Sequence, residues 1–164
     1  FNTIYLKSLI DILKKMGAKL KVSKNSIKVS KGSKLKSTSL STSPYPGFPT
    51  DLQAQLMSLM CISDGKSKIK ETIFENRFMH VPELNRLGAN ITVEKDTATI
   101  IGNQTFKGAQ VMASDLRASI SLVLAAMNAN GQTTLNRVYH LDRGYENIEK
   151  TLGSLGAKIK RQKN

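Results

Sequence analysis

The sequence predicts an α/β fold assembled from copies of one repeated unit, with apolar helices inside and strands outside. One observation is a phrase that occurs three times, at 9–22 ("LIDILKKMGAKLKV"), 81–93 ("VPELNRLGANITV") and 148–161 ("IEKTLGSLGAKIKR"). Each copy is an amphipathic run, a Gly-Ala pair and then alternating apolar and polar residues, which is typical of a helix followed by a strand. Such repetition indicates a fold built from one supersecondary unit.

A longer alignment supports the same unit, between "TDLQAQLMSLMCISDG" (50–65) and "SDLRASISLVLAAMNANG" (114–131). An acid, a closing glycine and a later arginine recur at spacings of 64, 66 and 66 residues, as Asp51/Asp115, Gly65/Gly131 and Arg77/Arg143. We therefore expect a single incomplete domain, with a half repeat at 1–43 and repeats at 44–107 and 108–164. Because the chain opens in the middle of a unit, we expect it to be a fragment.

The elements of each repeat follow in order. The runs after Asp51 and Asp115 are apolar nearly all round and predict buried helices, with Thr50 or Ser114 as the cap and a Thr50–Gln53 capping box. The runs at 68–74 and 133–139 predict strands. Shorter one-sided helices come next, the earlier with Pro82 in its first turn, and each copy of the phrase ends its helix at a glycine, Gly17, Gly88 or Gly156.

Two stretches outside the helices complete the expected unit. Residues 89–101 ("ANITVEKDTATII") predict a β-hairpin that turns in 94–97. Residues 30–49 are rich in Ser, Lys, Pro and Gly, so we expect a loop between units there.

The net charge of +13 is confined to the two ends of the chain. Residues 1–43 hold ten Lys and one acid, residues 158–164 hold four basic residues and no acid, and residues 44–157 hold eleven of each. Because Tyr and Phe do not alternate with these lysines, a nucleic-acid partner is not supported. The plainer interpretation is a solvated face with a modest attraction for anions.

Other classes of site and location are constrained by single residues. One cysteine allows no internal disulfide and fits the cytoplasm, and Cys61 lies in a Leu- and Met-rich run where we expect a small buried hydrophobe. His80 and His140 have no partners at metal-ligand spacing, so we expect no metal. No apolar run is long enough to cross a membrane, and we expect no signal peptide.

Four motifs make a family resemblance specific. "PYPGFPTDLQAQ" (44–55), "ETIFENRFMHVPELNRLGA" (71–89), "GAQVMASDLRASISLVLAA" (108–126) and "YHLDRGYENIEKTLGSLGAKI" (139–159) resemble the last third of the UDP-N-acetylglucosamine enolpyruvyl transferases. The resemblance implies a two-domain fold, in which each domain is an inside-out α/β barrel of three strand-helix-strand-helix-strand-strand units. This chain would be most of one domain.

The resemblance also implies a reaction. These enzymes open peptidoglycan synthesis by moving the enolpyruvyl group of phosphoenolpyruvate to the 3-hydroxyl of UDP-N-acetylglucosamine. They release phosphate through a tetrahedral intermediate, without metal or organic cofactor. The matching positions have implied roles: Asp51 meets the sugar hydroxyl, the backbone of Ile73 contacts the nucleotide sugar, Arg77 lies near the cleft, Asp115 and Arg117 line the phosphoenolpyruvate side, and Arg143 holds its carboxylate.

Elementary chemistry fits these residue types, but a plainer interpretation exists. Guanidinium groups grip carboxylate and phosphate at two points and stabilise developing negative charge, and a carboxylate can accept a hydroxyl proton. Equally, an acid in the first turn of a helix can only complement its dipole. The arginines could pair with neighbouring acids, Arg77 with Glu75 and Arg143 with Asp142.

Alternatives remain at this point. The chain could be a portion of the related shikimate-pathway enolpyruvyl transferase, although "FENRFMHVPEL" and "YHLDRGYE" fit the nucleotide-sugar enzymes better. It could instead be a non-catalytic basic module, whose binding would fall steeply with salt. The family's reactive cysteine, a Lys-Asn pair and further arginines have no match here, so we expect no activity without the missing N-terminal part.

An incomplete barrel should expose apolar helix surface. We therefore predict that the chain alone self-associates, measured by light scattering during size-exclusion chromatography. A sharp, reversible thermal transition in monomeric protein would contradict this expectation.

Overall fold

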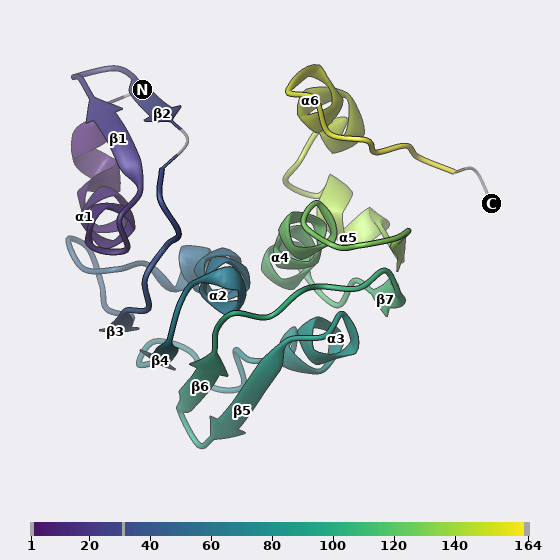
Figure 1. Ribbon diagram of the computed structural model, residues 1–164, viewed down its shortest axis with the longest axis horizontal. Coiled ribbons are helices and arrows are strands. Elements are labelled where there is room, and N and C mark those ends of the chain that lie inside the picture. The colour runs from purple at the N-terminus through teal and green to yellow at the C-terminus, as the bar shows by residue number, and fades with distance from the viewer. Residues whose placement is uncertain (1, 31, 163–164) are drawn as a thin grey trace.

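The computed structural model describes residues 2–30 and 32–162 of the 164-residue chain. Figure 1 shows α1, β1 and β2 at one end and α5 and α6 at the other, with α2 and α4 between them. A four-stranded sheet lies along one side of α2. This mixed α/β arrangement follows the order of elements that the repeat predicts.

The elements alternate along the chain. The helices are η1 (Thr3–Leu6), α1 (Lys7–Lys15), η2 (Thr50–Leu52), α2 (Gln53–Ile62), α3 (Val81–Arg86), α4 (Leu116–Ala126), α5 (Tyr139–Asp142) and α6 (Ile148–Ser154). The strands are β1 (Lys19–Val22), β2 (Ile27–Ser30), β3 (Ser39–Ser41), β4 (Lys66–Lys70), β5 (Asn90–Glu94), β6 (Thr97–Ile101), β7 (Gln110–Met112) and β8 (Thr134–Asn136).

The largest sheet has the order β3-β4-β6-β5. Strands β5 and β6 form the predicted hairpin, whose turn is Lys95–Asp96, with Lys95 at φ 54°. Alternation along β4 buries Ser67 and Ile69 and exposes the lysines between them. One face of this sheet therefore packs on the helices while the other carries Lys66, Lys68 and Lys70 into solvent.

Helices α2 and α4 pack side by side and run in the same direction. Arg117 in the first turn of α4 bonds to Asp51 at the start of the α2 segment, and further along Ser58 donates to the carbonyl of Ser121 at 2.9 Å. Both helices are buried on most sides, as their predominantly apolar sequences predict. Their N-termini consequently lie at the same end of the molecule.

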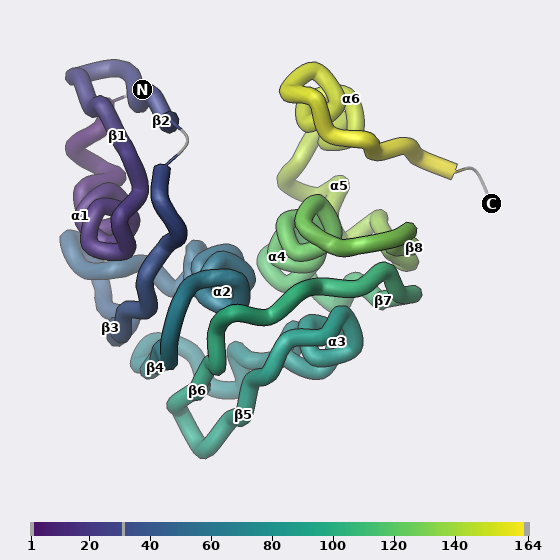
Figure 2. The backbone as a smooth tube through the Cα atoms, in the orientation of Figure 1, coloured from purple at the N-terminus to yellow at the C-terminus, as the bar shows by residue number. Residues whose placement is uncertain are grey.

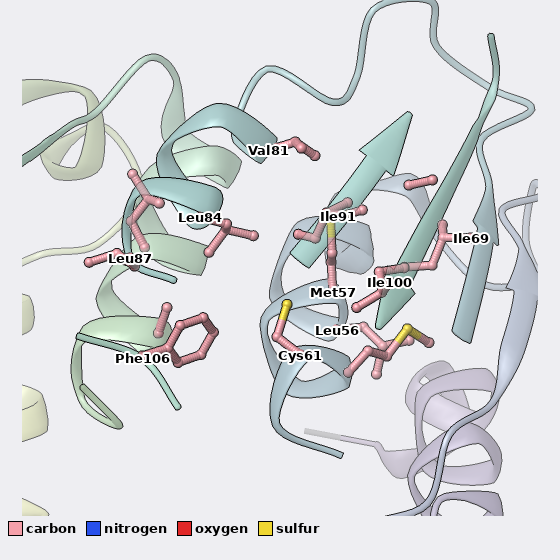
Figure 3. Close-up of a cluster of buried hydrophobic side chains, with 14 of the residues drawn as sticks. Leu56, Met57, Cys61, Ile69, Val81, Leu84, Leu87, Ile91, Ile100 and Phe106 are labelled. Carbon is pink, nitrogen blue, oxygen red and sulfur yellow. The ribbon is translucent and has the colours of Figure 1, made fainter. Parts of the chain in front are cut away.

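The main core fills the space between α2, α3 and the sheet. Figure 3 shows Leu84, Leu87 and Phe106 on one side and Met57, Cys61 and Ile100 on the other. The link from β6 to β7 runs along the ends of α2 and α3 (Figure 2), where Gln104 and Lys107 donate to the carbonyls of Cys61 and Leu87. A smaller cluster joins α4, α5 and α6 through Ile120, Val123, Leu141 and Ile148.

Several local predictions are confirmed. Gly17, Gly88 and Gly156 follow α1, α3 and α6 with φ of 94°, 98° and 96°, the left-handed conformation that glycine adopts without strain. Pro82 lies in the first turn of α3. Cys61 is fully buried.

Other local predictions are wrong. Residues 30–49 are not all loop, because β3 pairs in parallel with β4. The second predicted strand, 133–139, is only β8 and ends where Arg137 takes φ 57°. Residues 157–162 form no strand among the described residues. Thr50 does not cap α2, whose N-cap residue is Leu52; the Thr50 hydroxyl oxygen accepts from Arg77 instead of from a helix amide.

An apolar groove of about 290 Å³ lies between α1, α2 and α4. Its walls include Leu9 and Leu13 of α1, Leu59 of α2, and Leu124 and Met127 near the end of α4. Met127 remains 49% exposed. The groove therefore leaves part of both buried helices uncovered. No described helix is both long and apolar enough to span a membrane.

Candidate functional site

The candidate site forms where the N-termini of α2 and α4 meet. Asp51, in the single turn of η2 that leads into α2, accepts hydrogen bonds from Arg77 and from Arg117. Arg117 reaches it from the first turn of α4, and Arg77 from the segment before α3. Three residues that the sequence singled out separately are thus in direct contact.

The two oxygens of Asp51 have different surroundings. Arg77 Nη2 lies 3.3 Å from Oδ1, and Arg117 Nε bonds to the same oxygen. Oδ2 has no hydrogen-bond partner among the described residues, and the side chain is 58% exposed. The arrangement fixes the carboxylate through one oxygen while the other faces solvent, where a hydroxyl group could donate to it.

Arg77 is the more enclosed of the two arginines. Its Nε donates to the Thr50 hydroxyl at 3.1 Å, and its guanidinium carbon lies 4.7 Å from the centre of the Phe74 ring. These contacts fix the guanidinium plane between Thr50, Asp51 and an exposed aromatic ring. The predicted alternative, a pair with Glu75, does not form.

Arg117 is more exposed and its charge is strongly favoured. The pKa of Arg117 is raised, first by the hydrogen bond to Asp51, although partial burial opposes the change. The charges of Asp51 and Asp115 act in the same direction. Arg117 therefore stays cationic at every pH at which the protein is folded.

Asp115 has a structural task. Its Oδ1 accepts from the backbone amides of Arg117 and Ala118 at 2.8 and 3.0 Å, so Asp115 itself, and not Ser114, is the N-cap of α4. The cap fixes the first turn of α4 and with it Arg117. Asp115 thus makes the helix-start contacts that the plainer interpretation describes, whereas the carboxylate of Asp51 caps no helix.

Beneath Asp51 lies a buried carboxylate, Glu71, 4% exposed. Its Oε1 accepts from the Thr42 hydroxyl at 2.8 Å and from the amides of Ile73 and Phe74 at 2.9 and 3.2 Å. Its Oε2 accepts from the Thr50 hydroxyl at 3.0 Å. Four donors from three segments thus satisfy this buried charge.

Ile73 and Arg143 form no hydrogen bond or ion pair with Asp51, Arg77 or Arg117. Ile73 is 38% exposed, and its amide is held by Glu71. Arg143 is exposed, ends α5 and has no ion pair among the described residues, because Asp142 pairs with Arg161 at 2.6 Å instead. Gly144 packs on Leu116, where a Cβ would come within 2.8 Å of a side-chain carbon, so Arg143 belongs to the same end of α4.

Burial rules out two other reactive side chains. Burial raises the pKa of the Cys61 thiol to about 12, so this cysteine is a core residue and not a nucleophile. Burial likewise lowers the pKa of His80 to about 4, against the attraction of Asp115. His80 Nε2 lies 3.2 Å from the Met57 sulfur, inside the core. Among the described residues, no group of three or more His, Cys, Asp or Glu side chains could hold a metal ion.

The arrangement can bind an anion beside a hydroxyl group. Arg143 has no protein partner among the described residues, Arg117 is only partly screened, and Asp51 offers one oxygen. The charges that such chemistry needs come from four separate segments of the fold.

The family model for EPSP synthase (3-phosphoshikimate 1-carboxyvinyltransferase) matches residues 2–152. The chain belongs to this family. Curated relatives include the UDP-N-acetylglucosamine 1-carboxyvinyltransferases of Pelagibacter ubique, 59% identical over 152 residues, and Azorhizobium caulinodans, 56% identical over 157 residues. These matches cover 93% and 95% of this chain but only 36% and 37% of the relatives, so the chain spans little more than a third of their length.

Solved structures place the fold in the same family. The enolpyruvyl transferase NikO from Streptomyces tendae matches with a TM-score of 0.87 at 32% identity, over 94% of this chain and 36% of NikO. An EPSP synthase from Acinetobacter baumannii matches with a TM-score of 0.67 at 18% identity, over 96% of this chain and 37% of that protein. The second likeness concerns the fold alone.

Sequence reasoning missed Thr50 as an arginine ligand and Glu71 altogether. One signal was present: the repeat spacing of 66 that relates Arg77 to Arg143 places Glu71 opposite Arg137, a change from acid to base. Charge reversal at equivalent positions marks a residue that the shared fold does not require.

The buried His80 should make stability depend on pH. His80 has an ordinary pKa of 6.5 and a folded value of about 4, so the unfolded chain binds more protons between these values. Stability is fully present above pH 6.5 and falls as the pH drops toward 4, by about 2 kcal/mol between pH 7.5 and 5. Urea unfolding at the two pH values measures this. His80→Gln should reduce the difference and His140→Gln should keep it; an unchanged difference in His80→Gln would contradict the assignment.

Proposed function

We propose that this chain is the C-terminal portion of an enzyme that transfers the enolpyruvyl group of phosphoenolpyruvate to the 3-hydroxyl of UDP-N-acetylglucosamine and releases phosphate. The observation that carries the proposal is Asp51, held through Oδ1 by Arg77 and Arg117 while Oδ2 is free to accept from a hydroxyl. In bacteria this reaction is the first committed step of peptidoglycan synthesis. Both substrates and the single buried thiol fit a cytoplasmic enzyme.

Asp51 takes the role of hydroxyl acceptor. Its free oxygen would accept a hydrogen bond from the 3-hydroxyl of the sugar and take up that proton as the hydroxyl oxygen bonds to C2 of phosphoenolpyruvate. In the same addition the C2=C3 double bond opens and C3 gains a proton from an acid of the complete enzyme. Loss of a C3 proton and of phosphate then restores the double bond. The two arginines limit rotation of the carboxylate, so the acceptor is positioned before the substrate arrives. Ile73, whose amide Glu71 holds, would present its backbone to the nucleotide sugar.

The arginines take the anionic groups. Arg143 carries a full charge with no ion-pair partner among the described residues, so its guanidinium can bind the phosphoenolpyruvate carboxylate at two points. Arg117 is oriented by its contact with Asp51 and by the Asp115 cap, at the same end of α4 as Arg143. It would add fixed positive charge near the tetrahedral intermediate. No step requires a metal or an organic cofactor.

The acceptor substrate is chosen on sequence likeness. Relatives at 56–59% identity bear the nucleotide-sugar name, whereas the EPSP synthase structures share 18%. We therefore prefer UDP-N-acetylglucosamine over 3-phosphoshikimate. A basic binding module without catalysis does not explain the Asp51 cluster, whose residues Asp51, Arg77 and Arg117 lie outside the lysine-rich ends.

The test uses a hybrid in which this chain replaces the matching segment of the Pelagibacter ubique relative. We expect phosphate release from phosphoenolpyruvate with UDP-N-acetylglucosamine and none with 3-phosphoshikimate. Asp51→Asn and Arg143→Ala should each lower kcat/KM by about a hundredfold, the size typical of a lost acid-base or charge-stabilising group. Glu94→Gln, an exposed acid on β5, is the matched control. A correctly folded hybrid without activity, or an active Asp51→Asn variant, would contradict the proposal.

The finer fold belongs to the same proposal. We infer one incomplete domain, divided at 1–43, 44–107 and 108–164, of a two-domain protein with inside-out barrels. Each complete repeat supplies one apolar central helix, α2 or α4, and the half repeat supplies none. The groove beside α2 and α4 has the apolar character that a third such helix would cover. That helix would come from the N-terminal part, the partner of this chain.

Two methionines of equal exposure test the third helix. Met127, 49% exposed, lines the groove, whereas Met112, 46% exposed, lies on β7 outside it. In the hybrid, Met127→Lys should lower the free energy of unfolding by about 2–4 kcal/mol because it buries a charge, and Met112→Lys by less than about 1 kcal/mol. Urea denaturation measures both. Equal effects would mean that no segment covers the groove.

A further inference from the structure

We propose that Glu71 is a positioning residue for the transfer reaction: one of its oxygens aligns Arg77 through the Thr50 hydroxyl, and the other shapes the turn that carries Ile73 and Phe74. This inference rests on the proposed function for its kinetic consequence. Its structural part stands on the contacts of Glu71 alone.

The two oxygens of Glu71 serve two different segments. Oε2 accepts from Thr50 at 3.0 Å, and Thr50 in turn accepts from Arg77 Nε at 3.1 Å. Because the single Thr50 proton points to Glu71, the hydroxyl lone pairs are directed at Arg77, whose other end contacts Asp51. A chain of hydrogen bonds thus runs from the buried carboxylate to the exposed one.

Oε1 organises the segment after β4. It receives the amides of Ile73 and Phe74, which places the Phe74 ring beneath the Arg77 guanidinium at 4.7 Å. The Thr42 hydroxyl also donates to it, while that same hydroxyl accepts from the amide of Thr72. Arg77 is therefore held from two sides, by Thr50 and by Phe74, and both contacts trace back to Glu71.

Comparison of the two repeats indicates that this device is not needed for folding. The position equivalent to Glu71 is Arg137, and the hydroxyl of Ser114, equivalent to Thr50, hydrogen-bonds among the described residues only to its neighbour Asp115, at 3.5 Å. Arg143, equivalent to Arg77, has no bound partner among the described residues. The second repeat thus folds without the buried acid, with a different backbone at that position, where Arg137 takes φ 57°, and the acid is found only in the repeat that holds Asp51.

Glu71→Gln separates the two tasks. Its amide oxygen can stay toward the three donors at Oε1, but its NH₂ group then faces Thr50 as a donor and reverses that hydrogen bond. The Thr50 hydroxyl must then accept from the new donor and loses its fixed direction toward Arg77. Glu71→Ala removes both tasks. Thr50→Val breaks the link to Arg77, and Thr50→Ser retains it.

The first readout is kinetic, in the hybrid enzyme. Glu71→Gln and Thr50→Val should each lower kcat/KM about tenfold, as expected for a hydrogen bond to a charged group, while Thr50→Ser and Glu94→Gln keep it within about twofold. In an Arg77→Ala background, Glu71→Gln should change kcat/KM by less than about twofold, because it acts through Arg77. An equal loss in both backgrounds would reduce Glu71 to a general stabilising residue.

The second readout needs no activity and so separates this inference from the proposed function. Hydrogen exchange of the peptide containing Ile73 and Phe74 should accelerate more than tenfold in Glu71→Ala and change little in Glu71→Gln or Glu94→Gln. Unchanged exchange in Glu71→Ala would overturn the role in the turn. An inactive hybrid with the predicted exchange pattern would refute the transferase assignment while upholding Glu71 as the residue that shapes this corner.

Discussion

The parallel packing of α2 against α4 is the constraint on which the rest of the structure depends. The contacts of Asp51 with Arg117 and of Ser58 with Ser121 align the two helices in nearly the same register. Parallel alignment brings both N-termini to one end, where their dipoles point positive charge toward solvent. Acidic and basic side chains at that end are then forced into contact, although 64 residues of sequence separate the two acids.

The candidate site arises because equivalent positions of the two repeats hold different residues or make different contacts. The carboxylate of Asp115 accepts hydrogen bonds from backbone amides of α4. That of Asp51 instead contacts two arginines through one oxygen and keeps the other free. Arg117 reaches across to Asp51, whereas its equivalent Gln53 is fully buried. The carboxylate with a free oxygen is therefore found in only one of the two repeats, and the other repeat contributes Arg117 beside it. A repeat fold can specialise in this way because its backbone does not depend on the corner residues.

Most helices, their ends and the hairpin could be predicted from the sequence, because each depends on residues that are close together in the chain. Periodicity located the helices, glycines marked their ends, and the 89–101 alternation identified the hairpin. Strand β3 was missed because its Ser-Leu-Ser sequence has little β propensity and its partner lies about 29 residues away. Within the site, the Asp51 and Arg77 positions followed from motifs, but Glu71, which is linked to Arg77 through the Thr50 hydroxyl, did not. That residue's four donors come from three separate segments, and only the folded chain brings them together.

The central claim is that Asp51 offers Oδ2 to the sugar hydroxyl while Arg77 and Arg117 hold Oδ1. A crystal structure of the hybrid enzyme with UDP-N-acetylglucosamine bound tests it most directly. We predict the 3-hydroxyl at hydrogen-bond distance from Oδ2, about 2.6–3.2 Å, with both arginines still on Oδ1. A nucleotide sugar bound with its 3-hydroxyl on another residue, or with Asp51 turned away from the arginines, would contradict it.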